Sequence, residues 1–254
     1  MRTIEEIKEI LGLKENGCNH CQIARKTGIP RTTVKDICHR YGDLFGLEKV
    51  LQTKEKRTKW CRFEPQRDIA DNSLYSYLLG MYLGDGCISR ATRCEKLRIV
   101  LDEKYPCIIN ETKRAIAGLV TNKVGEVKRK GCVEVFSYSQ RWSSFFPQHG
   151  KGKKHQRKIE LTGWQWGIVE NSPQKMLRGL LHSDGCVYDA KSKGYVYRRY
   201  SFVNRSKDII KIFETTCDLL QIRHRRVAYP KIYRVDVSRK KEVAKLEKFI
   251  GRKT

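Results

Sequence analysis

The sequence of 254 residues predicts an α+β protein in which a duplicated unit follows a small all-helical domain. Three observations support this prediction. A nine-residue segment at residues 78–86 recurs, with substitutions, at residues 177–185. Each copy is followed by alternating apolar and polar stretches, typical of strands, and by apolar residues at helical spacing. The first 45 residues show helical spacing alone, interrupted by glycines.

The composition indicates a polyanionic partner. The chain contains 53 Lys and Arg residues against 28 Asp and Glu residues, a formal net charge of +25. Because like charges repel one another in a folded chain, such an excess favours nucleic acid as the binding partner. The hydrophobic fraction of 39% predicts a globular protein. No apolar run reaches the roughly 18 residues that a membrane-spanning helix requires, so we expect no membrane span.

The cysteines and the N-terminus bear on the compartment. Acidic residues stand among the first ten, where a signal peptide has basic and then apolar residues, so we expect a cytoplasmic protein with reduced thiols. Cys18-x2-Cys21 has the spacing of a zinc-binding pair. Cys38, His39 or Cys61 would have to complete that site, so structural thiols are the preferred interpretation and zinc is the alternative.

Residues 1–45 are expected to form three short helices. The second helix begins after Asn19, which forms a capping box with Gln22, and ends at Gly28. The third covers residues 30–41. The run C-Q-I-A-R-K-T-G-I-P-R-T-T-V-K-D-I resembles the helix-turn-helix of bacterial DNA-binding proteins, and a helical bundle without DNA binding is the alternative. The resemblance implies DNA contacts from the third helix by Arg31, Thr32, Thr33 and Lys35.

Two further segments have the composition of connections. Residues 46–72 carry charges of both signs, Pro65 and little periodicity, which predicts a linker. Residues 151–172 begin with a strongly basic run and are expected to tether the two copies. The copies themselves are then expected at residues 73–150 and 173–254.

The repeated segment is interpreted as a helix that ends in an aspartate. The first copy reads L-L-G-M-Y-L-G-D-G and the second reads L-R-G-L-L-H-S-D-G, and their aspartates, Asp85 and Asp184, are 99 residues apart. Each copy has small residues four positions apart, and therefore on one helix face. They are Gly80 and Gly84 in the first copy and Gly179 and Ser183 in the second. Small residues at this spacing allow two helix backbones to touch, so we expect the two helices to pack together.

Two carboxylates at neighbouring helix C-termini need a counter-charge. The helix macrodipole disfavours an anion there, and a second carboxylate disfavours it further. Hard divalent cations such as Mg²⁺ or Mn²⁺ accept carboxylates, and paired metal ions support in-line displacement at a phosphodiester. We therefore expect Asp85 and Asp184 to be metal ligands and catalytic residues. A structural Asp-Gly helix cap is the alternative, which the second copy in register disfavours.

On the paired nonapeptide, residues 73–254 resemble the LAGLIDADG homing endonucleases in their single-chain, two-motif form. The resemblance implies two αββαββα units with pseudo-twofold symmetry, whose antiparallel sheets form a saddle over DNA. It also implies a monomeric hydrolase that makes a metal-dependent double-strand break in a long, specific target of double-stranded DNA. The family's metal ligands correspond to Asp85 and Asp184. The sixth motif position, acidic in the family, is Leu83 and His182 here.

The helix-turn-helix resembles that of bacterial and phage members of this family, which implies a bacterial or phage-encoded protein. The family also has a basic residue beside each scissile phosphate. The nearest matches are Lys231, in K-I-Y-R-V-D-V-S, and Lys130, in K-G-C-V-E-V-F-S, with contact to a distant phosphate as the alternative. Asp102 and Asn204, at strand-to-helix junctions, either order the attacking water or cap a helix.

The expected strands of the second copy are rich in arginine. Because side chains alternate between the two faces of a strand, about half of these arginines should face DNA as phosphate and base readers. The candidates are Arg198, Arg199, Arg223, Arg225, Arg226 and Arg234.

Two other functions are compatible with this sequence. A DNA-binding transcriptional regulator would keep the saddle without cleavage, and an RNA-binding maturase would prefer folded RNA. Retention of both aspartates disfavours the regulator, because a protein without catalysis has no need of two adjacent unfavourable carboxylates. The helix-turn-helix disfavours the maturase, because it suits the major groove of B-form DNA.

Overall fold

The computed structural model describes residues 2–51, 63–192 and 194–251. The chain divides into two compact units, residues 1–62 and 63–254. Residues 52–62 of the expected linker, and with them Cys61, lie outside the described residues. In the described parts of the chain, no helix combines the length and the apolar character that crossing a membrane requires.

The N-terminal unit is a helical bundle of α1 (Ile4–Glu15), α2 (His20–Thr27), α3 (Arg31–Tyr41) and a further helix at residues 44–51. The expected capping box of α2 is present, since the Asn19 and Gln22 side chains each accept the other's backbone N–H. Gly28 ends α2 with a φ of 69°, a left-handed conformation that favours glycine. The core is formed by apolar residues from all four helices, including Ile10, Leu11, Ile23, Val34, Ile37 and Leu47.

The larger unit repeats one order of elements twice. The first copy contains α6 (Asn72–Gly84), β1 (Gly86–Arg90), β2 (Glu95–Asp102), α7 (Pro106–Ala117), β3 (Val124–Arg129), β4 (Cys132–Ser139) and α8 (Trp142–Phe145). The second contains α10 (Pro173–Asp184), β5 (Gly185–Ser192), β6 (Tyr195–Asn204), α11 (Lys207–Leu219), β7 (Arg225–Ala228), β8 (Tyr233–Val237) and α12 (Lys240–Ile250). The short α5 (Pro65–Asp68) precedes them, and η1 (Lys154–Gln156) and α9 (Gly163–Asn171) connect them. The αββαββα order is confirmed in both copies.

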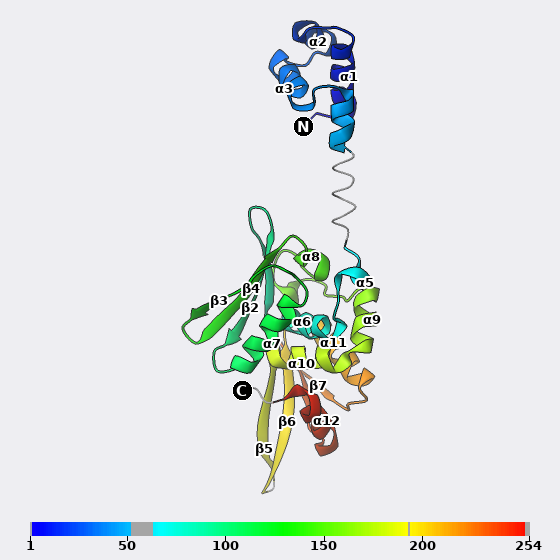
Figure 1. The fold of residues 1–254 in the computed structure, drawn as a ribbon. Helices are drawn as coiled ribbons and strands as arrows, with labels where there is room; N and C mark the ends of the chain where they lie inside the picture. The colour runs from blue at the N-terminus through cyan, green and yellow to red at the C-terminus, as the bar shows by residue number, and fades with distance from the viewer. Residues whose placement is uncertain (1, 52–62, 193, 252–254) are drawn as a thin grey trace. The chain divides into compact units, whose positions relative to one another are not determined.

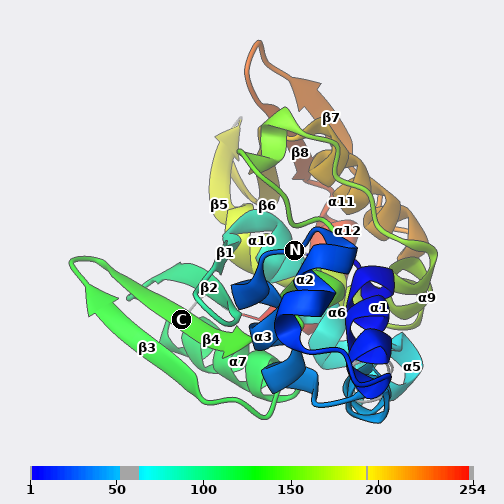
Figure 2. The same ribbon diagram turned by 90° about the horizontal axis from the view of Figure 1, so that it is seen from above.

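Each copy forms its own four-stranded antiparallel sheet. The strand orders are β1-β2-β4-β3 and β5-β6-β8-β7, so the same connectivity occurs twice. The register repeats as well, since Gly86 pairs with Ile99 and Gly185 pairs with Phe202 at the corresponding place. Helices α6 and α10 lie between the two sheets (Figures 1 and 2).

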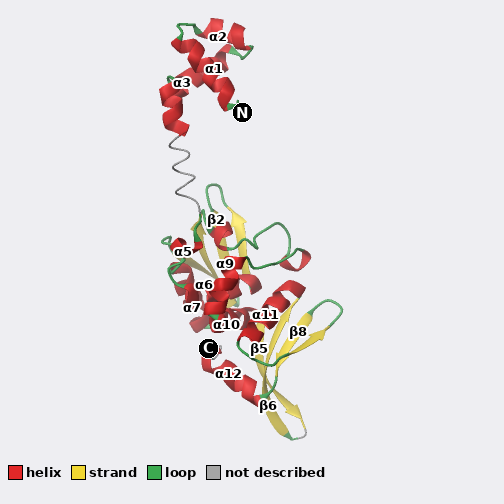
Figure 3. Cartoon of the chain, turned by 90° about the vertical axis from the view of Figure 1, so that its right-hand side faces the viewer, coloured by secondary structure: helices red, strands yellow, loops and turns green. Residues whose placement is uncertain are grey.

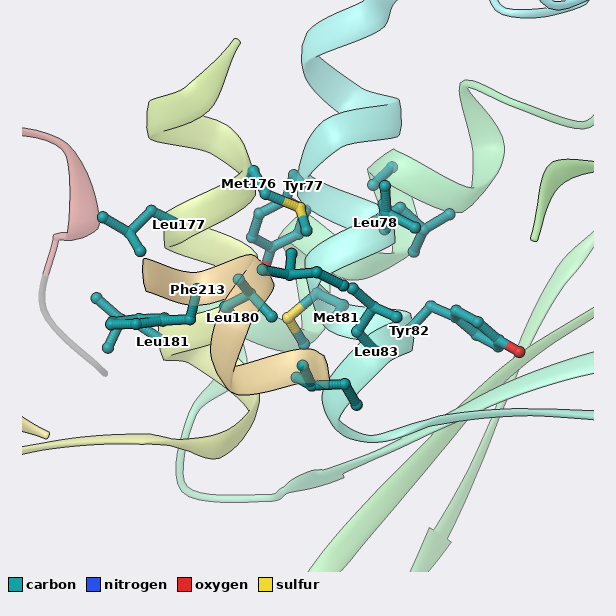
Figure 4. Close-up of a cluster of buried hydrophobic side chains, with 14 of the residues drawn as sticks. Tyr77, Leu78, Met81, Tyr82, Leu83, Met176, Leu177, Leu180, Leu181 and Phe213 are labelled. Carbon is teal, nitrogen blue, oxygen red and sulfur yellow. The ribbon is translucent and has the colours of Figure 1, made fainter. Parts of the chain in front are cut away.

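Helices α6 and α10 pack with their backbones in contact, as the small residues of the repeated segment predict. A Cβ atom at Gly80 would lie 2.6 Å from the carbonyl oxygen of Met176 and 2.7 Å from the amide nitrogen of Leu180. A Cβ atom at Gly179 would meet the carbonyl oxygen of Tyr77 in the same way. Buried side chains surround the contact (Figure 4), among them Leu78, Met81, Leu83, Leu177, Leu181 and Phe213.

The two sheets differ at the β5–β6 hairpin. Strand β2 is paired with β4 along its whole length, from Glu95 to Asp102. Strand β6, by contrast, pairs with β8 only from Tyr200 to Asn204, so residues 195–199 are paired with β5 alone. The hairpin therefore continues as a two-stranded ribbon beyond the four-stranded sheet (Figures 1 and 3).

Candidate active site

Asp85 and Asp184 stand at neighbouring helix ends. Asp85 caps α6, and its N–H donates to the carbonyls of Met81 and Tyr82, while Asp184 is the last residue of α10. A Cβ atom at Gly84 would lie 3.1 Å from Oδ2 of Asp184, so the C-terminal turns of the two helices are in direct contact. The close packing of the helices thus fixes the separation of the two aspartates.

Asn204 orients the second aspartate. Its Nδ2 donates to Oδ2 of Asp184 at 2.6 Å, and its Oδ1 accepts the N–H of Ser206 at 2.7 Å. Ser206 is the N-cap of α11, so the amide is held at both ends. In the first copy, Asp102 is exposed and its Oδ1 accepts the N–H of Lys104 at 3.0 Å.

Lys154, from the tether, places a positive charge at these helix ends. Its Nζ donates to the carbonyls of Leu83 at 3.1 Å and Gly84 at 3.2 Å, and also to that of Tyr82. These carbonyls belong to the last turn of α6, where helix carbonyls lack intrahelical partners. Burial lowers the pKa of Lys154 to about 8, against the opposing effect of the Asp184 and Asp85 carboxylates.

The sequence pattern favours basic residues in the later strands, at Lys130 and Lys231, and does not indicate Lys154. The structure puts both lysines in exposed turns, Lys130 between β3 and β4 and Lys231 between β7 and β8. The run G-K-G-K-K-H-Q-R-K signals a basic tether, but it does not indicate which of its lysines reaches the helix ends.

A cavity of about 270 Å³ lies beside the second aspartate. It brings together one carboxylate, one amide and three basic side chains from separate parts of the chain. Its lining consists of Leu83, Gly84, Lys154, His155, Asp184, Val203, Asn204, Arg205 and Ile209.

The carboxylates at this site suit a hard divalent cation. Such ions take one or two protein carboxylates and complete their coordination with waters and substrate phosphates, so Asp85 and Asp184 fit as the protein's share. Within residues 2–51, 63–192 and 194–251, no group of three His, Cys, Asp or Glu side chains could hold a metal ion. Of the thiols considered for zinc, Cys38 is only 3% exposed in the core of the N-terminal unit.

The second sheet turns one face away from the helices. Arg198 pairs with Glu247 of α12 at 3.6 Å and Arg226 pairs with Glu214 of α11, so both lie on the helix-covered face. By alternation, Arg199, Arg225 and Arg234 occupy the open face, whereas Arg223 precedes β7.

Polar atoms on this open face lack partners in the described structure. Among the described residues, nothing forms a hydrogen bond with Arg199 Nε, Ser201 Oγ or Asp236 Oδ1, although all three atoms are buried, whereas Arg234 Nε lies 3.1 Å from Oδ2 of Asp236. Buried polar atoms are nearly always satisfied, so such a cluster favours a surface that receives a polar ligand.

The open face of the first sheet combines basic and aromatic side chains. Lys96 Nζ lies 2.7 Å from Glu134 and 4.2 Å from the ring centroid of Phe136. This hydrogen bond lowers the pKa of the buried Glu134 carboxyl, and Arg129 lies 3.4 Å from the same group. In the N-terminal unit, α3 exposes Arg31, Thr32 and Lys35, while Thr33 is half-buried.

A search with protein-family models finds no match, and neither does one among curated proteins. Several solved structures are similar in fold. A structure of mesophilic variants of the homing endonuclease I-DmoI is 15% identical, with 71% of this chain and 97% of that chain covered and a TM-score of 0.49. The LAGLIDADG meganuclease I-AabMI bound to uncleaved DNA is 16% identical, with 69% of this chain and 82% of that chain covered and a TM-score of 0.46. The N-terminal LAGLIDADG domain of WhiA is 13% identical, with 71% of this chain and 83% of that chain covered and a TM-score of 0.46. The solved structures similar to this chain thus include LAGLIDADG homing endonucleases and a LAGLIDADG domain, a likeness of fold.

Proposed function

We propose that the protein is a site-specific DNA endonuclease of the homing type, which hydrolyses one phosphodiester in each strand of a double-stranded target. The observation that supports this most strongly is the pair of motif aspartates at touching helix ends, between two sheets with basic open faces. A single chain contains both aspartates, so we propose that it acts as a monomer. The extra helical unit suits a long target.

In this proposal Asp85 and Asp184 hold Mg²⁺ or Mn²⁺, which supplies charge stabilisation at the phosphoryl group and activates water. Asn204 keeps the Asp184 carboxylate in one orientation through its 2.6 Å hydrogen bond. Lys154 offsets the negative charge of the two aspartates and of the α6 carbonyls. The protein's own contribution is a fixed, charge-balanced site at which a phosphate can be positioned.

The proposed DNA interface follows the faces of the sheets. Arg199, Arg225 and Arg234 bind from the second sheet, and Lys96 and Arg98 from the first. Helix α3 adds contacts to a flanking segment through its exposed residues. Lys130 and Lys231, at the tips of hairpins, are proposed to contact phosphates away from the scissile bonds.

Selection followed by cleavage tests this function. Duplexes bound from a random pool at near-physiological salt are incubated with Mg²⁺ or EDTA and with the wild type, Asp85→Asn or Asp184→Asn. We expect defined double-strand cuts by the wild type, none in EDTA, and nicks or no cleavage from either variant. Asp189→Asn, which removes an exposed carboxylate on β5, is the matched control and should cut normally.

One result would overturn the nuclease. Selective binding without any cleavage, equal in the wild type and both motif variants, would leave a DNA-binding regulator. Affinity alone does not decide between the two, because a chain of net charge +25 binds any duplex at low salt.

A further inference from the structure

We infer that His155 contacts the scissile phosphate of one DNA strand, on the Asp184 side of the site. This inference rests on the nuclease function proposed above and names the residue that binds the substrate in one half of the site. His155 belongs to the tether, and neither copy of the duplicated unit contains it.

The tether is fixed on both sides of His155. Lys154 is anchored to the last turn of α6 by its hydrogen bonds to backbone carbonyls. Arg157 donates to the carbonyl of Gln148. The three residues of η1 are therefore held against the site by both flanks.

Lys154 has no donor left for a phosphate in this arrangement. An ammonium group has three N–H bonds, and those of Lys154 point to three carbonyls, Tyr82, Leu83 and Gly84. It can contribute charge to the site, but a direct contact would cost the helix its cap. The next residue along the chain, His155, also lines the cavity and carries an N–H donor.

His155 is available for such a contact. The ring is half-buried and lines the cavity of about 270 Å³. Across the described residues, none forms a hydrogen bond with it. The other polar groups of the cavity include Asp184, Asn204 and Arg205, all from the second copy. An imidazole N–H that faces this space suits an anionic phosphate oxygen, and the hydrogen bond is strengthened by the charge of the phosphate.

The contact should serve one strand only. In the described part of the chain η1 occurs once, between the two copies, so the pseudo-twofold symmetry provides no second histidine beside Asp85. Asp85 and Asp184 each belong to the half of the site that would cut one strand. Loss of His155 should therefore slow the cleavage of one strand, whereas a general defect in folding slows the cleavage of both.

The test uses a selected duplex labelled separately on each strand, with Mg²⁺. We expect His155→Ala to reduce the cleavage rate of one strand on the order of tenfold to a hundredfold, because this is the effect of losing one hydrogen bond to a charged group. Nicked duplex should then accumulate. Asn204→Ala, which frees the Asp184 carboxylate, identifies that strand. His155→Gln should restore part of the rate, because an amide N–H replaces that of the ring.

His149→Ala is the matched control. This histidine, just before the tether, is also half-buried, but it lines a different depression, beside Arg90 and Arg93. It should leave both strand rates unchanged.

A binding measurement in EDTA gives a readout that does not depend on cleavage. A methylphosphonate at the scissile position removes the charge of that phosphate and should weaken binding of the wild type more than binding of His155→Ala. The inference would be overturned if the methylphosphonate weakened binding equally for both proteins. It would also be overturned if the wild type cuts and His155→Ala cleaves both strands at unchanged or equally reduced rates. If the wild type fails to cut, the proposed function falls, and this inference falls with it.

Discussion

At the scale of single residues, Lys154 accounts for how two aspartates can be tolerated side by side. The C-terminus of a helix carries partial negative charge, and both Asp85 and Asp184 add to it. Lys154 contacts the exposed carbonyls of α6 and lies close enough to both carboxylates for each to favour its charged form. The site therefore has a counter-charge of its own before any metal ion or DNA binds.

The lowered pKa of Lys154 predicts a pH dependence of stability. The folded value is about 8, and the ordinary value of 10.5 applies when the chain unfolds. Between these values the unfolded chain holds more protons at this group, so the free energy of unfolding rises with pH in this window; below about pH 8 the group contributes no further change. In EDTA, we expect the free energy of unfolding of the wild type to rise by roughly 1 to 3 kcal/mol relative to that of Lys154→Met between pH 8 and 10.5. Urea unfolding at several pH values measures this difference. A difference that stays flat with pH would contradict this.

The site residues differ in how far the sequence could reveal them. Asp85 and Asp184 could be predicted because each belongs to a motif that occurs twice, and their chemistry follows from the residue type. Lys154 and His155 could not, because their positions depend on where a basic tether crosses α6. That crossing is a tertiary contact between residues about 70 positions apart, and it leaves no local periodicity.

At the scale of elements, an ion pair links the middle helix of each copy to an edge strand of its sheet. Lys113 of α7 pairs with Glu126 of β3 at 2.7 Å. In the second copy Glu214 of α11 pairs with Arg226 of β7, at the same place but with the charges exchanged. The repeat thus keeps the contact while the two copies diverge in sequence.

The contact between α6 and α10 leads to a prediction about Gly80. A Cβ atom would come within 2.6 Å of backbone atoms that cannot move without separating the helices. We expect Gly80→Ala to lower the free energy of unfolding by about 1 to 3 kcal/mol, even though alanine is the better helix former. Gly167→Ala in α9 is the control, because its Cβ would meet nothing within 4 Å, and it should stabilise by up to about 1 kcal/mol. Chemical denaturation measures both, and destabilisation by the control alone would refute the packing argument.

Neighbouring arginines of β7 predict opposite outcomes for DNA binding. Arg225 lies on the open face, whereas Arg226 is engaged with Glu214 on the helix-covered face. Arg225→Ala should weaken binding and reduce the slope of log affinity against log salt by about 1. Arg226→Ala should leave this slope unchanged and act on stability instead. Titrations at four salt concentrations check this, and a reduced slope for Arg226→Ala would show that the faces are assigned the wrong way round.

The element order was predictable from the sequence, and some lengths were not. Alternation and helical spacing predict that strands and helices follow each motif helix. The closing helix of the first copy is only four residues long, because Pro147 disfavours a helical conformation at Phe146. That proline is visible in the sequence. The extension of β6 beyond β8 is not, because it depends on which strands pair.

At the scale of the larger unit, a partly buried polar network joins the two copies. Arg178 of α10 forms hydrogen bonds with Glu111 of α7, at 2.7 to 3.1 Å, and with carbonyls at the end of α12. His182, at the sixth motif position, lies 3.1 Å from the Tyr77 hydroxyl and 3.0 Å from the Ile250 carbonyl. The sixth position is therefore structural here, and the network helps to hold the two halves of the site in register.

At the scale of the whole chain, the two compact units predict two separable contributions to DNA affinity. If α3 binds a flanking segment, the wild type should bind a long duplex more tightly than one trimmed to the core target. The difference in affinity should be on the order of tenfold or more, because the two binding sites are linked in one chain. Lys35→Ala should reduce this preference by roughly tenfold and leave affinity for the short duplex unchanged. Lys8→Ala removes an equally exposed lysine from α1 and should change neither value. Fluorescence anisotropy at near-physiological salt measures all six affinities, those of three proteins for two duplexes. Equal binding of both duplexes by the wild type would mean that the N-terminal unit serves another partner.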